Sequence, residues 1–244
     1  MATQPLLLIV YAPALVRDDS RRDTLVHAME HTLPGLHLSW TISDEGQFVP
    51  APRRDLPDGE LPLLCNADED HLVTLTGWES PAGVSPGGHA QLEVHAKWPM
   101  DAAGISNAME VLSAVAEEAR AFWGHSTPDG AALDIALQTS PSLDGPPRPP
   151  RGLPALKLPE DLGSPGTPHR LGWLNYWSAA TARALGFPDP ARDAELLTRS
   201  RRTATGGWVV QLTDAPLDLD DPRHLDALLR AYERFPSIGG RSIP

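Results

Sequence analysis

The sequence predicts an α+β protein in which helices pack on a mixed, largely antiparallel sheet within a single domain. Two observations support this fold class. Residues 89–98, HAQLEVHAKW, alternate strictly between apolar and polar side chains, which is typical of a strand with one buried face. The segments expected to be helical do not alternate regularly with strands, as they would in a parallel β-α-β sheet. We therefore expect residues 1–244 to form one domain.

The N-terminal segment predicts a strand, a helix and a second strand. Residues 6–11 are apolar and bounded by prolines, which favours a buried strand. Ser20, with Asp23 three positions later, predicts a capping box, and the helix that it opens has Leu25 on its apolar face. The second strand is expected at residues 36–42.

The central part predicts a hairpin followed by the longest helix. Residues 71–78 and 89–98 flank a loop rich in Pro and Gly, so we expect them to pair as antiparallel strands. The long helix is expected to run from its N-cap, Asp101, to Trp123, because apolar residues recur between them at helical spacing. Gly124 is expected to end this helix.

The C-terminal part begins with a segment that is unusually rich in proline. Nine of the 28 residues in 141–168 are proline, which excludes a regular helix or a central strand and predicts an irregular wrapping segment. The elements expected after it are a strand at 171–177, a helix at 179–185, a helical stretch at 189–199 and a buried strand at 207–213. Asp220 or Asp221 caps the last helix, and Pro222 lies in its first turn.

The net charge of −12 is unevenly distributed along the chain. Residues 1–140 carry 7 Lys and Arg against 20 Asp and Glu, a net charge of −13, whereas residues 141–244 carry 13 against 12, a net charge of +1. An acidic surface repels nucleic acid backbones and anionic membranes, and it steers a basic protein toward itself. We therefore expect a protein partner, with no direct binding of nucleic acid or membrane. The alternative is an acidic surface that serves solubility alone.

Cysteine content and the apolar N-terminal segment bear on the compartment. Cys65 is the only cysteine, which excludes an intramolecular disulfide and a multi-cysteine zinc site and suits a reducing compartment. Residues 6–16 are apolar, but no Lys or Arg precedes them, and eleven residues are too few to span a bilayer. We therefore expect a cytoplasmic protein.

Two polar patterns in the hairpin region could suggest catalysis. Residues 83–87, GVSPG, match the G-x-S-x-G pattern of a serine nucleophile, but Pro86 lacks the backbone N–H that an oxyanion hole takes from that position. We interpret this segment as a turn. His89, Glu93 and His95 share the polar side of one strand, where a rise of about 3.3 Å per residue separates the two histidines by about 20 Å. The two histidines therefore cannot bind one metal ion.

A third pattern resembles a zinc site. His27 and His31, in HAMEH, match the H-x-x-E-H pattern, in which a helix places both histidines on one face. The third ligand would have to be Glu117 or Glu118, from a distant helix. Because none of the three patterns is convincing, we expect no bound metal, no cofactor and no enzymatic activity. A metal-dependent hydrolase that uses His27, His31 and one of these glutamates is the alternative function.

Three motifs in the C-terminal third carry a resemblance to a known family. They are GWLNYWS at 172–178, GGWVVQLT at 206–213 and DLDDPRHLDALLRAYE at 218–233. In this order they resemble the immunity protein 52 family of bacterial polymorphic-toxin systems, over residues 170–238. The positions that match the family are Gly172, Trp173, Tyr176, Gly207, Asp221 and His224.

The resemblance implies an immunity protein, or antitoxin, that acts in interbacterial competition. Such a protein binds a co-produced toxin, typically a nuclease with a restriction-endonuclease-like fold, and neutralises it by protein–protein contact. The acidity of residues 1–140 agrees with a basic partner. A regulatory binding module without a toxin is a further alternative. The expected contact residues are Asp68, Glu69 and Asp70, with Asp218 and Asp220 as a second patch.

Overall fold

The computed structural model describes residues 4–17, 19–51, 61–139 and 148–241. In this part of the chain ten strands form one sheet, in the order β3-β2-β4-β5-β6-β1-β7-β8-β10-β9, and every neighbouring pair is antiparallel. The strands are β1 (Pro5–Pro13), β2 (Trp40–Ile42), β3 (Phe48–Pro50), β4 (Leu61–Cys65), β5 (Thr74–Ser80), β6 (Gln91–Pro99), β7 (Trp123–Pro128), β8 (Leu174–Trp177), β9 (Arg201–Arg202) and β10 (Trp208–Gln211). The predicted α+β class is confirmed.

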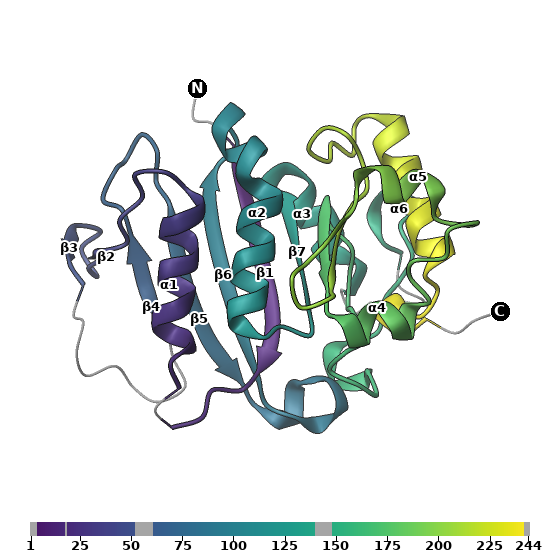
Figure 1. Cartoon of the computed structure of the whole chain (residues 1–244), viewed down its shortest axis with the longest axis horizontal. Helices are drawn as coiled ribbons and strands as arrows, with labels where there is room; N and C mark the ends of the chain where they lie inside the picture. Colours follow the sequence, from purple (N-terminus) through teal and green to yellow (C-terminus); the bar gives the residue numbers. More distant parts are fainter. Residues whose placement is uncertain (1–3, 18, 52–60, 140–147, 242–244) are drawn as a thin grey trace.

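Helices cover one face of the sheet at its centre. The helices are α1 (Arg21–Thr32), α2 (Ala102–Ala119), α3 (Asp129–Ala136), α4 (Ala179–Leu185), α5 (Ala194–Arg199) and α6 (Pro222–Arg234). Figure 1 shows α1 and α2 side by side in front of the central strands. Alternate residues of β1, from Leu6 to Ala12, are completely buried, as expected for side chains that point toward these helices. No helix among the described residues is long and apolar enough to cross a membrane.

The opposite face carries a row of five aromatic residues and one glutamate that runs across six strands. The register places in line Trp78, Glu93, Tyr11, Trp123, Trp177 and Trp208, which we call the cross-strand row. Exposure falls along the row from 42% at Trp78 to 1% at Trp177. Phe187 and Phe235 pack edge-on against Trp177, with ring centroids 5.3 and 4.9 Å away. This face is therefore open over β5 and β6 and covered over β8.

The first helix begins where it was predicted, but the predicted capping residue is wrong. Ser20 precedes α1, but its own backbone is helical and its side chain makes no capping hydrogen bond. Asp19 caps the helix instead, because its carboxylate accepts the Arg21 backbone N–H at 3.0 Å. The Arg21 guanidinium also donates to the carbonyls of Pro13 and Ala119, at 2.8 and 3.1 Å. This ties the ends of β1 and α2 to α1.

The predicted end of the long helix is also wrong. α2 ends at Ala119, and Arg120 rather than Gly124 follows its last residue, in the left-handed conformation (φ 55°). Trp123 and Gly124 instead begin β7, which lies between β1 and β8. A Cβ on Gly124 would lie 2.5 Å from Val10 Cγ1, so the glycine allows the two strands to approach. Pairing with β1 and β8 therefore stabilises Trp123 and Gly124 in a strand, although their sequence pattern favours a helix.

Other element boundaries differ from those predicted. Of residues 36–42 only Trp40–Ile42 are strand, and of residues 189–199 only Ala194–Arg199 are helix. The unpredicted elements are β3, β4, β7, β9 and α3. Within the described residues 148–168, the only regular structure is two short 3-10 turns. Three leucines anchor this segment in the core: Leu153, Leu156 and Leu162.

Candidate functional site

The first predicted patch is the turn that joins β4 to β5. The Asp68 carboxylate accepts the backbone N–H groups of Asp70 and His71, both at 3.1 Å, and so shapes the turn. Glu69 and Asp70 are exposed, and neither forms an ion pair within the described part of the chain. Their carboxylates are therefore available to a partner.

The second predicted patch is partly neutralised by the protein itself. Asp220 forms an ion pair with Arg151 at 2.8 Å, and Arg151 also donates to the Leu219 carbonyl at 2.8 Å. The Asp218 carboxylate accepts the Asp220 backbone N–H at 2.9 Å. This loop is thus held to the proline-rich segment and offers less free negative charge than the first patch.

The structure does not bring the two patches together, but it places them at the same end of the sheet. β4 and β10 are six strand positions apart in the antiparallel sheet, so they run in the same direction. The loop after β10 returns toward the centre of the sheet, because Asp218 and Asp220 line one pocket with Gln4 and Pro128, at the ends of β1 and β7. The second patch is therefore closer to the first than β10 is to β4.

Gly172, Trp173 and Gly207, three of the family-motif positions, fix the packing of the C-terminal strands. A Cβ on Gly172 would lie 2.2 Å from Thr127 Oγ1, and one on Gly207 would lie 2.7 Å from the Trp177 carbonyl. Trp173 is buried, and its indole N–H donates to the Thr213 carbonyl at 2.9 Å. These roles are structural.

The remaining motif positions join the C-terminal third to the rest of the fold. The Tyr176 hydroxyl donates to Glu117 at 2.7 Å, and burial, followed by this bond, raises the pKa of Tyr176. Asp221 caps α6 by accepting the Arg223 backbone N–H at 2.9 Å, so it rather than Asp220 is the cap. His224 Nδ1 accepts the Asp218 backbone N–H at 3.1 Å.

The catalytic patterns are not assembled into sites. Ser85 is buried, and its hydroxyl donates to the Pro81 carbonyl at 2.9 Å. The rings of His27 and His31 stack on α1 with centroids 6.1 Å apart, as the i, i+4 spacing predicts. Glu117 is occupied by Tyr176, and the described residues contain no group of three or more His, Cys, Asp or Glu side chains that could hold a metal ion.

A polar cluster on the face of the cross-strand row was not predicted. It consists of Glu93 and His95 on β6, Tyr11 on β1, His125 on β7, and His169 and Arg170 before β8. The alternation of residues 89–98 placed the two β6 residues on an outward face. The other four come from distant segments, so no local pattern could have joined them.

Burial dominates the electrostatics of the cluster. It raises the pKa of Tyr11 to about 12 and lowers the pKa of His125 to about 3, to which the Arg170 charge also contributes. Burial and Arg170 likewise lower the pKa of His169 to about 4. Burial opposes ionisation of Glu93, but His95, whose Nε2 lies 3.5 Å from the carboxylate, and a hydrogen bond from Ser80 lower its pKa. At neutral pH the two histidines are therefore neutral and Glu93 is charged.

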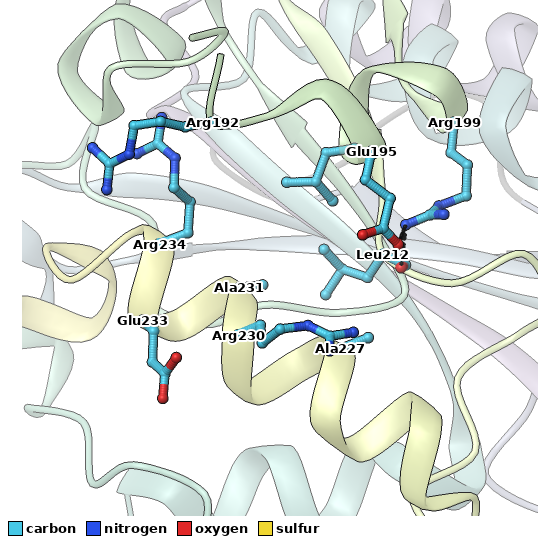
Figure 2. A pocket seen from close by; sticks show the side chains of 10 residues that line it. Arg192, Glu195, Arg199, Leu212, Ala227, Arg230, Ala231, Glu233 and Arg234 are labelled. Atoms are coloured by element: carbon cyan, nitrogen blue, oxygen red, sulfur yellow. Dashed lines mark hydrogen bonds and ion pairs between the residues drawn. The ribbon is translucent and has the colours of Figure 1, made fainter. Parts of the chain in front are cut away.

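A groove between α5 and α6, of about 380 Å³, contains four arginines (Figure 2). Arg199 pairs with Glu195 at 3.2 Å, and Arg234 pairs with the buried Asp193 at 2.6 Å. Arg230 is likewise paired within α6. Because carboxylates of the protein already neutralise three of the guanidinium groups, this groove does not favour an anion strongly.

Comparisons with known proteins identify the family and the fold. The family described as "Domain of unknown function (DUF5953)" matches residues 17–243. A solved structure described as "Pseudomonas aeruginosa T6SS protein PA0821" superposes with a TM-score of 0.56 at 15% sequence identity, covering 95% of this chain and 74% of that chain. No curated protein matches the chain. At this identity the likeness concerns the fold alone.

Proposed function

The chain belongs to the DUF5953 family, and we propose that it is an immunity protein that binds a co-produced bacterial toxin and blocks it by protein–protein contact. The observation that carries the proposal is the exposed turn of Asp68, Glu69 and Asp70, in a part of the chain with a net charge of −13. The fold likeness to a T6SS protein supports a setting of interbacterial competition. The resemblance of residues 170–238 to the immunity protein 52 family agrees with this setting.

The proposed partner is a basic nuclease, for example one with a restriction-endonuclease fold. An enzyme that holds nucleic acid needs a basic surface, which an acidic protein can occupy. Glu69 and Asp70 are suited to this because no cation within the described part of the chain pairs with them. The protein would act in the cytoplasm by occupying the toxin, without a cofactor, without catalysis and without binding nucleic acid or membrane itself.

The proposed interface lies at the end of the sheet where both acidic patches are found. A standard interface buries about 800 Å² on each partner, which corresponds to a disc roughly 32 Å across. One partner could therefore contact both Glu69 and Asp218. We assign the larger share of electrostatic steering to Glu69 and Asp70, because Arg151 already pairs with Asp220.

Co-expression with the toxin encoded beside this protein tests the proposal. Glu69→Lys with Asp70→Lys should abolish protection and slow association at low salt by about tenfold or more, because steering depends on charge. Asp68 is left unchanged because its carboxylate shapes the turn. The matched control is Asp44→Lys with Glu45→Lys, an equal charge change in the exposed turn between β2 and β3, at the other end of the sheet.

Two results would count against the proposal. If a folded Glu69→Lys, Asp70→Lys variant protects cells as well as the unaltered protein, the acidic-turn interface is wrong. If the unaltered protein neither binds the toxin nor protects cells, the immunity function itself is wrong.

A further inference from the structure

Three nitrogens without hydrogen-bond partners belong to the cross-strand row and the polar cluster. Trp123 Nε1, His125 Nε2 and Arg170 Nε form no hydrogen bond with the described residues. Trp123 and His125 are at most 4% exposed. The indole and guanidinium nitrogens can only donate. Buried donors without acceptors destabilise a fold, so this grouping indicates a place that receives acceptor atoms.

His169 holds Arg170 in place. Nε2 of His169 lies 2.8 Å from the Lys157 carbonyl, which can only accept, so this nitrogen carries the proton. Because the ring is neutral, its Nδ1 must accept the hydrogen bond from Arg170 Nη2 at 3.2 Å. One edge of the guanidinium is thus oriented by a neutral partner.

The charge of Arg170 has no ion-pair partner in the described structure. No carboxylate lies within 4.0 Å of its nitrogens. Glu93 is near enough to be affected by the Arg170 charge, but its own contacts are with Ser80 and His95. Arg170 is therefore an oriented cation able to pair with a further anion.

The position on the sheet permits access from one side. Trp78, stacked on His95 with ring centroids 4.2 Å apart, is 42% exposed, and the His95 side chain is 27% exposed. Trp123, two strands further on from His95, is buried and stacks on Tyr11 with centroids 4.2 Å apart. The unpartnered nitrogens thus lie where the open half of the face meets the covered half.

We propose that the face of β6, β1 and β7 beside Arg170 binds a carboxylate group. A carboxylate offers two acceptor oxygens and no donor, which matches a set of donors built around one cation. Arg170 would supply the charge, and Trp123 would supply its indole N–H. His125 would supply Nε2–H in the tautomer whose Nδ1 accepts the Thr127 hydroxyl at 3.1 Å. The carboxylate could belong to a free organic acid or to a glutamate or aspartate side chain of a protein. This inference does not depend on the proposed immunity function.

Nuclear magnetic resonance of ¹⁵N-labelled protein tests the site and distinguishes the two sources. Acetate is the probe for a free acid, acetylated and amidated glutamate is the probe for a protein side chain, and acetamide is the uncharged control. The indole N–H signal of Trp123, assigned with Trp123→Phe, should shift saturably with at least one carboxylate and not with acetamide. Saturation by the glutamate probe alone would favour a protein source.

Substitutions of Arg170, with Arg183 as the control position, test whether the guanidinium binds the carboxylate. Arg170→Gln should weaken the binding of the carboxylate by about tenfold or more, because it removes a charge-assisted hydrogen bond. Arg183→Gln, an equal charge change on an exposed position of α4, should bind as the unaltered protein does. If Arg170→Gln does not fold, Arg170→Lys, which keeps the charge but lacks the Nε donor, replaces it and should also bind more weakly. An equal response to acetamide, no saturable shift, or unchanged binding by the folded Arg170 variant would overturn the proposal.

Discussion

The Tyr176 hydroxyl donates a 2.7 Å hydrogen bond to Glu117, and this contact joins β8 to α2 across 59 residues of sequence. Thr203 and Thr205 donate to the same carboxylate, at 2.9 and 2.6 Å. The loop before β10 is therefore fastened to the long helix through one side chain.

We predict that Tyr176→Phe lowers the free energy of unfolding by about 1 to 2 kcal/mol, because it removes a hydrogen bond to a charged acceptor. Urea denaturation measures the change. Glu118→Gln, on the exposed neighbouring position of α2, is the control and should leave the midpoint unchanged. A Tyr176→Phe variant as stable as the unaltered protein would show that the contact contributes nothing to stability.

His125 should make the fold sensitive to acid. Burial lowers its pKa from 6.5 to about 3, so below pH 6.5 the unfolded chain takes up a proton that the folded protein refuses. The stability contributed by neutral His125 is therefore complete above pH 6.5 and decreases as the pH falls toward 3. His125→Gln should reduce the dependence of unfolding free energy on pH in this range, by at most about 1.4 kcal/mol per pH unit.

Urea denaturation at a series of pH values measures this effect. His89→Gln, which changes an exposed histidine, is the control and should keep the slope of the unaltered protein. Equal slopes for the two variants would contradict the assignment.

Gly124→Ala should destabilise the protein by about 1 to 3 kcal/mol, since the added methyl group would lie 2.5 Å from Val10 Cγ1 and 2.9 Å from the Ile9 carbonyl. Gly83→Ala is the matched control, because a Cβ there meets no atom within 4 Å. Calorimetry of the two variants compares them directly. Equal melting temperatures would mean that β1 and β7 can separate without cost.

Asp221→Ala should lower the melting temperature, because the side chain accepts the Arg223 backbone N–H at the start of α6. Asp220→Ala should lower it less, since the exposed Asp220 side chain contributes an ion pair with Arg151 but no cap. The reverse order would assign the cap to Asp220.

Local patterns predicted the elements whose chemistry is complete within a short segment. The predicted helix at 179–185 is α4, with Gly186 in the left-handed conformation after it. The alternation of residues 89–98 correctly placed Leu92, Val94, Ala96 and Trp98 on the buried face of β6. A helix cap and a strand alternation can each be recognised from residues that are adjacent in the sequence.

Elements that depend on distant partners were mispredicted. Trp123 fitted the apolar spacing of a helix, yet it pairs with Tyr11 on one side and Trp177 on the other. The same difference between local and distant residues separates the two candidate sites. The acidic turn at Asp68 was visible because its residues are consecutive, whereas His125 and Arg170 came to one place only through folding.

The sequence by itself thus determined the α+β class, the charge asymmetry and the elements with local caps or strict alternation. The tertiary structure decided where the long helix ends, which aspartate caps α6, and that the two acidic patches lie at one end of the sheet. It also assembled the polar cluster around Arg170. The physical reason is that strand pairing joins residues far apart in sequence, and the burial and hydrogen bonds gained there outweigh local propensity.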